Sequence, residues 1–74
     1  MTYTIYGQPG CKYCTLAKEL LTGLDLPFIY IDISEDLLER TKFKAKGHET
    51  VPQVYFEGTH LGGYIQLKEL LNDS

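Results

Sequence analysis

One short stretch decides the fold: Tyr3–Cys14, which reads YTIYGQPGCKYC. It begins with a β-prone run, Tyr3–Tyr6, which predicts the first strand. The run Gly7–Gly10 then breaks that strand with two glycines and a proline. Two cysteines three positions apart open the segment Cys11–Thr22, in which apolar residues recur at helical spacing. The stretch therefore predicts a strand, a tight turn and a helix that begins at a cysteine pair.

The next two elements follow the same alternation. The apolar run Phe28–Ile31 predicts a second strand, which we expect to be buried on both faces. Asp32 or Ser34 is expected to cap the following helix, and Gly47 to end it. The inner face of that helix is expected to consist of Leu37, Leu38 and Thr41.

Two short strands and a helix complete the chain. The run Val51–Glu57 predicts a third strand, which Pro52 opens because proline lacks the N–H that a strand interior requires. After a turn, His60–Leu61 predicts a very short fourth strand, and two glycines lead into a last helix. The inner face of that helix is expected to consist of Tyr64, Leu67, Leu70 and Leu71, with Ile65 directed away from the core.

The order of elements, βαβαββα, predicts an α/β fold in a single domain, residues 1–74. The first two strands are expected to pair in parallel through a helical crossover. The last two are expected to pair antiparallel, because only a short turn separates them. We therefore expect a four-stranded mixed sheet with three helices on its two faces.

Composition excludes several classes of function. The formal net charge is −3 and the isoelectric point is near 5.2, which argues against nucleic-acid binding. No apolar run approaches the length of a membrane span. The first residues lack the basic and apolar segments of a signal peptide, so we expect a reducing, cytoplasmic location.

The cysteine pair points to redox chemistry. A disulfide that closes so short a loop stabilises a fold by only about 2 kcal/mol. A thiol attacks only as the thiolate, and the start of a helix together with Lys12 favours the anion of Cys11. Cys14 lies one turn inside the helix, so Cys11 is expected to attack and Cys14 to resolve the mixed disulfide. An alternative is a zinc site that adds His48 and His60 to the two cysteines, although such sites normally have a second close ligand pair.

Several segments together resemble glutaredoxins over nearly the whole chain. They are Tyr6, Cys11–Cys14, Thr50–Val54 and Gly62–Tyr64, in the order and spacing of that family. The short length is similar to that of compact bacterial and phage members. The resemblance implies a thioredoxin-like fold, and a dithiol oxidoreductase that uses glutathione as reductant and needs no metal. It also implies disulfide-containing client proteins, with ribonucleotide reductase among the candidates. We expect a monomer.

The resemblance also implies roles for individual residues. Cys11 matches the nucleophile, Cys14 the resolving cysteine, and Pro52 the cis-proline. The backbone of Val51 is expected to hydrogen-bond glutathione. The other residues expected to bind glutathione are Lys12, Tyr13, Thr50, Pro52, Gly63, Tyr64 and Gln66.

Three departures from the family pattern concern charge. Gln8 stands where a cation for the glycyl carboxylate of glutathione is frequent, and Lys12 stands where proline is usual. Ile65 and Gln66 stand where an acidic residue is usual. Two alternatives therefore remain open. One is a redoxin of the same fold that thioredoxin reductase reduces, and the other is an iron–sulfur carrier in which Cys11 and glutathione hold a cluster between two protomers.

Overall fold

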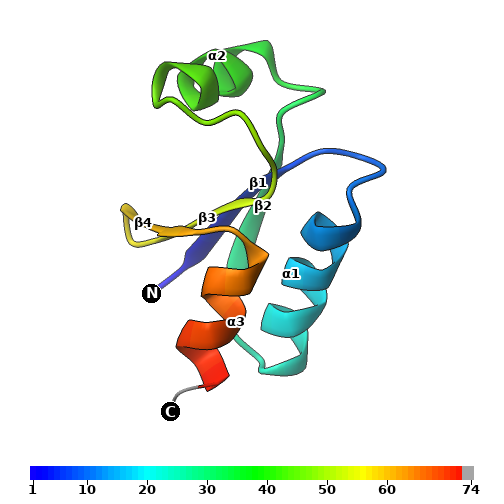
Figure 1. Cartoon of the computed structure of the whole chain (residues 1–74), viewed down its shortest axis with the longest axis vertical. Coiled ribbons are helices and arrows are strands. Elements are labelled where there is room, and N and C mark those ends of the chain that lie inside the picture. The colour runs from blue at the N-terminus through cyan, green and yellow to red at the C-terminus, as the bar shows by residue number, and fades with distance from the viewer. Residues whose placement is uncertain (73–74) are drawn as a thin grey trace.

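The computed structural model describes residues 1–72, whose elements alternate as the sequence predicts (Figure 1). In chain order the elements are β1 (Tyr3–Gly7), α1 (Lys12–Gly23), β2 (Phe28–Asp32), α2 (Leu37–Ala45), β3 (Gln53–Phe56), β4 (Thr59–Gly62) and α3 (Tyr64–Asn72). None of the helices within residues 1–72 has the length and apolar character needed to cross a membrane.

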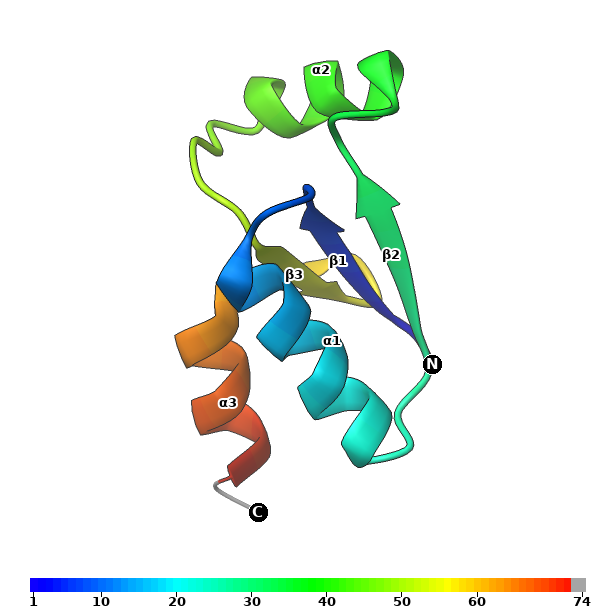
Figure 2. The same cartoon turned by 90° about the vertical axis from the view of Figure 1, so that its right-hand side faces the viewer.

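The four strands form one mixed sheet in the order β2-β1-β3-β4. β1 pairs with β2 in parallel, and β3 pairs antiparallel with both β1 and β4. These pairings confirm the predicted mixed sheet of four strands with three helices. Helices α1 and α3 lie side by side on one face, whereas α2 lies across the sheet from them (Figures 1 and 2).

The core lies between the sheet and the pair α1 and α3. Strand alternation directs Ile5 of β1 and Val54 of β3 toward these helices. Both side chains are fully buried, together with Ala17, Leu21 and Leu67 from the helices. The opposite face carries an aromatic cluster in which Phe43 of α2 contacts Tyr6, with 5.9 Å between ring centroids. The core therefore fixes the position of α1, and with it the position of the cysteines.

Strand β2 is less buried than the sequence predicts. It lies at the edge of the sheet, so it has only β1 as a neighbour. Ile29 is 55% exposed, because α1 and α3 cover the other face of the strand. The prediction that this strand is buried on both faces was wrong, since an apolar run does not reveal a strand's place in a sheet.

Helix α2 presents a different face to the protein from the predicted one. Leu37 and Leu38 are 79% and 64% exposed, and Thr41 is also exposed, whereas Phe43 is buried. The predicted inner face was therefore wrong, because the single large ring of Phe43 attaches this short helix. Asp36, and neither of the predicted residues, caps it by accepting the Glu39 N–H at 3.0 Å.

The other boundaries agree more closely with the sequence. Gly47 follows α2 with a φ of +87°, as predicted for a residue that ends a helix. In α3, Leu67 is fully buried and Ile65 is 53% exposed, as predicted. Leu70 is 51% exposed, so its assignment to the inner face was wrong. Leu70 projects from a different side of α3 than Leu67 and Leu71, which pack on the core.

Candidate active site

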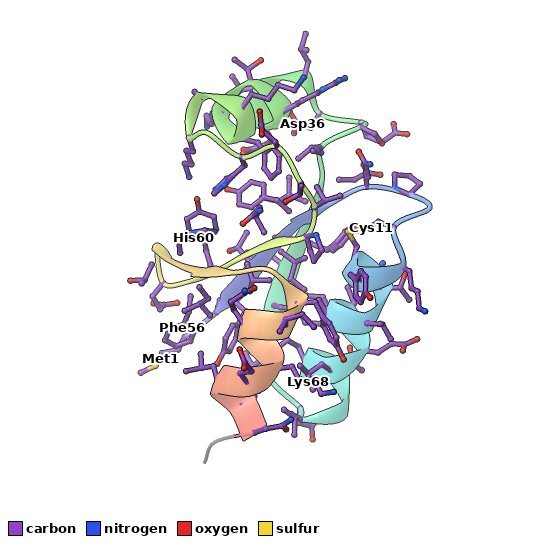
Figure 3. All side chains as sticks on the ribbon, in the orientation of Figure 1. Met1, Cys11, Asp36, Phe56, His60 and Lys68 are labelled. Carbon is purple, nitrogen blue, oxygen red and sulfur yellow. A yellow bond between two sulfur atoms is a disulfide. The ribbon has the colours of Figure 1, made fainter. Side chains whose placement is uncertain are left out.

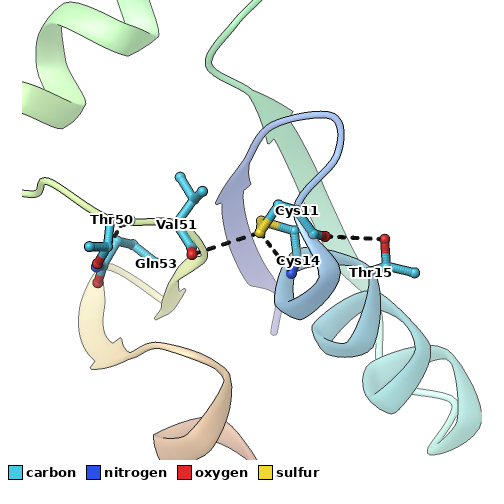
Figure 4. Close-up of a disulfide and its surroundings, with 6 residues drawn as sticks. All are labelled: Cys11, Cys14, Thr15, Thr50, Val51 and Gln53. Carbon is cyan, nitrogen blue, oxygen red and sulfur yellow. Dashed lines mark hydrogen bonds between the residues drawn. A yellow bond between two sulfur atoms is a disulfide. The ribbon is translucent and has the colours of Figure 1, made fainter.

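The two cysteines lie at the junction of β1 and α1, where they form a disulfide (Figure 4). Cys11 is the N-cap of α1, and its Sγ accepts the N–H of Cys14 at 3.1 Å. Cys11 is half-buried, whereas Cys14 is only 1% exposed. An incoming disulfide can therefore reach Cys11 but not Cys14.

The start of α1 favours negative charge on the Cys11 sulfur. The unpaired N–H groups of the first turn and the helix dipole both stabilise an anion at this position. No acidic residue lies in the first turn of α1, and the neighbouring Lys12 side chain is exposed. The local field therefore supports the thiolate on which attack depends.

The segment before β3 faces the disulfide. The carbonyl oxygen of Val51 lies 3.7 Å from Cys11 Sγ, so a Cys11 thiol can donate to it (Figure 4). The Val51–Pro52 peptide bond is cis and Pro52 is buried, in agreement with the match to the cis-proline. Gln53 holds this segment in place, since its Nε2 donates to the carbonyl oxygen of Thr50 at 3.1 Å.

A groove of about 510 Å³ lies beside Cys11, because its lining includes Val51, whose carbonyl oxygen contacts the Cys11 sulfur. Tyr13 and Tyr64 stand together in its wall, with 5.8 Å between their ring centroids. The residues that line the groove are Tyr13, Thr50, Val51, Pro52, Gln53, Gly62, Gly63, Tyr64, Ile65 and Gln66. The structure thus brings together every predicted glutathione-binding residue except Lys12.

Sequence reasoning missed Gln53 as a lining residue. Its side chain bridges two elements: the amide nitrogen binds Thr50, and Oε1 lies 2.7 Å from His60 Nε2. Gln53 belongs to the Thr50–Val54 segment that resembles glutaredoxins, but its bridging contacts depend on the pairing of β3 with β4. The pairing, and not the local motif, therefore reveals its role.

The N-terminus of α3 closes one end of the groove. Gly62 has a φ of +118°, a conformation that L side chains rarely adopt. Gln66 turns back over it, and its Oε1 accepts the Gly63 N–H at 2.8 Å. A ligand carboxylate that binds this N–H must therefore first displace the Gln66 side chain.

The histidines of the zinc alternative lie apart from the cysteines. Their rings are in tilted contact, with 4.7 Å between centroids, and His48 Nε2 lies 2.7 Å from the Tyr55 hydroxyl. Figure 3 shows His60 and Cys11 on different parts of the molecule. Within residues 1–72, no three His, Cys, Asp or Glu side chains are grouped so that they could hold a metal ion. The four residues of that alternative are therefore not assembled into one site.

Comparison with known proteins decides the family. The family model Glutaredoxin matches residues 3–61. The chain belongs to the glutaredoxin family. It is 39% identical over 71 residues to Glutaredoxin 1 of Salmonella typhimurium, a match that covers 85% of this chain and 82% of that one.

Solved glutaredoxin structures share the fold. The solution structure of glutaredoxin from Brucella melitensis is 33% identical, with a TM-score of 0.81 over 100% of this chain and 82% of that chain. A crystal structure of a buckwheat glutaredoxin–glutathione complex has a TM-score of 0.81 over 96% of this chain and 68% of that one. At 24% identity, the buckwheat likeness shows the fold alone.

The family and the cysteine pair together establish the kind of reaction. This glutaredoxin is a thiol–disulfide oxidoreductase, with its cysteines in the CxxC position of the family. A pair of cysteines in this arrangement exchanges two electrons with a substrate by passing between dithiol and disulfide.

Proposed function

We propose that this glutaredoxin reduces protein disulfides and glutathione mixed disulfides, and that glutathione restores its dithiol. The observation that carries this proposal is the groove beside the disulfide. It lies next to the accessible sulfur, and its volume of about 510 Å³ is in the range of small-molecule sites. The buckwheat neighbour was solved as a glutathione complex, which agrees with this choice of ligand.

In the proposed reaction Cys11 is the nucleophile. Its thiolate attacks one sulfur of the client disulfide, so that this sulfur joins Cys11 and the other leaves as a thiolate. Cys14 then attacks Cys11 Sγ, which forms the enzyme disulfide and releases the second client thiol. One glutathione thiolate reopens that disulfide as a mixed disulfide with Cys11. A second glutathione removes the first as glutathione disulfide.

The groove supplies polar groups along the length of a tripeptide. The Val51 backbone beside Pro52 would pair with the cysteine residue of glutathione, because its carbonyl already lies at the Cys11 sulfur. Tyr13 and Thr50 would flank the peptide. At the far end, Gly63 and Tyr64 would receive the γ-glutamyl group at the N-terminus of α3.

Two residues would compensate for the charged groups that are frequent in the family and absent from this chain. Lys12 is exposed at the start of α1, where its ammonium would supply the cation for the glycyl carboxylate that Gln8 lacks. Gln66 would exchange its hydrogen bond with Gly63 for one with the γ-glutamyl group. The role of Gln66 rests on its place in the groove, and the role of Lys12 rests on its charge and exposure beside Cys11.

The same chemistry suits clients with exposed disulfides. Ile65 and Tyr13 are 53% and 50% exposed at the rim of the groove, where they would pack against a client protein. We include ribonucleotide reductase among the candidate clients, on family grounds. A monomer in the cytoplasm is the setting we propose.

A second candidate electron donor is thioredoxin reductase. It is favoured by the Gln66 side chain, which occupies the Gly63 N–H that glutathione would use. The exposed Ile65 at the groove also suits a protein donor better than a charged tripeptide.

The turnover of a small glutathione mixed disulfide separates the two donors. One assay supplies glutathione, glutathione reductase and NADPH, and the other supplies thioredoxin reductase and NADPH. Rapid turnover in the first assay alone is the expected result. Turnover only with thioredoxin reductase, from folded protein with reactive thiols, would refute the use of glutathione.

A further inference from the structure

The space above Gly7 holds two chemically active groups. Gly7 ends β1 and is itself buried. A Cβ placed on Gly7 would overlap the Tyr30 hydroxyl oxygen and lie 2.9 Å from Cys14 Sγ. The hydroxyl from β2 and the sulfur from α1 therefore converge on one small volume, which exists because residue 7 has no side chain.

A lysine completes this arrangement. Lys18 lies one turn after Cys14 on α1, and its Nζ is 4.2 Å from the centroid of the Tyr30 ring. A cation at this distance is attracted to the ring face and so helps to fix the ring beside the sulfur. Within residues 1–72 the Tyr30 hydroxyl has no hydrogen bond to another residue and is not fully buried, so its proton is available to a partner.

The surroundings keep the Tyr30 hydroxyl protonated. Burial raises the pKa of Tyr30, and the negative charge of Asp32 on the same strand raises it further. The charged groups that face this site are thus Lys18 from α1 and Asp32 from β2. Tyr30 is consequently suited to donate a hydrogen bond and unsuited to act as a base.

We propose that the Tyr30 hydroxyl donates a hydrogen bond to the Cys14 thiolate once the disulfide has opened, and so prepares Cys14 for the resolving attack. In that attack the Cys14 sulfur bonds to Cys11 Sγ, and the bond from Cys11 to the substrate sulfur breaks. The substrate leaves with the electron pair as a thiolate and takes a proton from water. Cys14 gives its own proton to solvent beforehand, while Tyr30 keeps its proton throughout.

This role addresses a problem that burial creates. Cys14 is 1% exposed, and desolvation disfavours a thiolate there. Its helix position is also one turn away from the N-cap that serves Cys11. The proposal uses only the thiol–disulfide chemistry of the family, so it stands whether glutathione or a reductase is the electron donor.

The test titrates Cys14 by itself, in the Cys11→Ser protein, from the ultraviolet absorbance of its thiolate. Adding Tyr30→Phe keeps the ring under Lys18 and removes only the hydroxyl. The midpoint of the titration is expected to rise by about one pH unit, the size of one charge-assisted hydrogen bond. Tyr3→Phe is the matched control, because that ring packs on Phe56 and not on the cysteines, and it should leave the midpoint unchanged.

Two further readouts keep the proposal open to refutation. In the dithiol protein, Tyr30→Phe should slow protein-disulfide reduction about tenfold at neutral pH. In the Cys14→Ser background, Tyr30→Phe should leave the rate of disulfide reduction unchanged. If the Tyr30→Phe variant fails to fold, the NMR resonance of the Tyr30 Cζ in the Cys11→Ser protein should still titrate with Cys14. The proposal would be overturned by an unchanged Cys14 titration midpoint in folded Tyr30→Phe protein. It would also be overturned if the chemical shift of the Tyr30 Cζ did not change as Cys14 titrates.

Discussion

Substitution of Gly7 by alanine tests the packing around the cysteines most sharply. The backbone of Gly7 does not require glycine, since its φ lies outside the positive range. Space alone forbids a side chain there, because the added methyl would overlap the Tyr30 hydroxyl and press on Cys14 Sγ at 2.9 Å. Gly23, at the end of α1, is the matched control, with nothing within 4 Å of an added Cβ and no positive φ.

The two substitutions should have different effects on the free energy of unfolding. Overpacking of a buried site costs between about 1 and 3 kcal/mol. A domain of this size loses about 4–8 °C of melting temperature per kcal/mol, so Gly7→Ala should melt roughly 10 °C lower. Gly23→Ala should be neutral or stabilising by up to about 1 kcal/mol, since alanine favours the helix.

The assay is thermal unfolding of the oxidised proteins, followed by circular dichroism. Adding Tyr30→Phe to Gly7→Ala should recover part of the lost stability, because it removes the atom that the methyl meets first. If Gly7→Ala has the same melting temperature as the unsubstituted protein, or if both glycine variants lose stability equally, the described packing of Tyr30 and Cys14 is wrong.

Three other perturbations test separate parts of the account. Cys14→Ser should keep activity on glutathione mixed disulfides and lose activity on protein disulfides in steady-state assays; equal loss of both would mean that Cys14 does more than resolve. Burial lowers the pKa of His48 in the folded state, and the nearby His60 and Lys46 lower it further. Because the unfolded chain therefore binds a proton more readily, the free energy of unfolding should fall as the pH drops through about 6.5. Urea titrations should show a shallower fall for His48→Gln. Ile65→Ser should raise KM severalfold for a protein disulfide and leave a small substrate unaffected; the reverse pattern would contradict its place at the client contact.

Much of the active site was predictable because its parts are local motifs. The pair Cys11 and Cys14, the Thr50–Val54 segment and the two glycines each have a recognisable sequence. Their spacing suffices to predict that they meet, once the order of strands and helices is known. The groove accordingly contains the predicted glutathione-binding residues other than Lys12, with three additions, Gln53, Gly62 and Ile65.

The errors concern relations between elements that are distant along the chain. Ile29 is exposed because it lies on the face of the edge strand β2 that α1 and α3 do not cover, and no pattern within Phe28–Ile31 marks an edge. Leu37 and Leu38 are exposed because Phe43, late in the same helix, meets Tyr6 of β1. Tyr30 was treated as part of an apolar strand, and only the fold brings its hydroxyl beside Cys14.

If Cys11 reacts while glutathione lies in the groove, the trapped intermediate should show both features at once. The Cys14→Ser protein is treated with glutathione disulfide, the site of the adduct is mapped by mass spectrometry, and backbone amide shifts are measured by NMR. We predict one glutathione on Cys11, with shifts at Thr50–Gln53 and at Gly62–Gln66. An adduct whose shifts stay within the first turn of α1, or no adduct from protein with a reactive Cys11, would contradict the account.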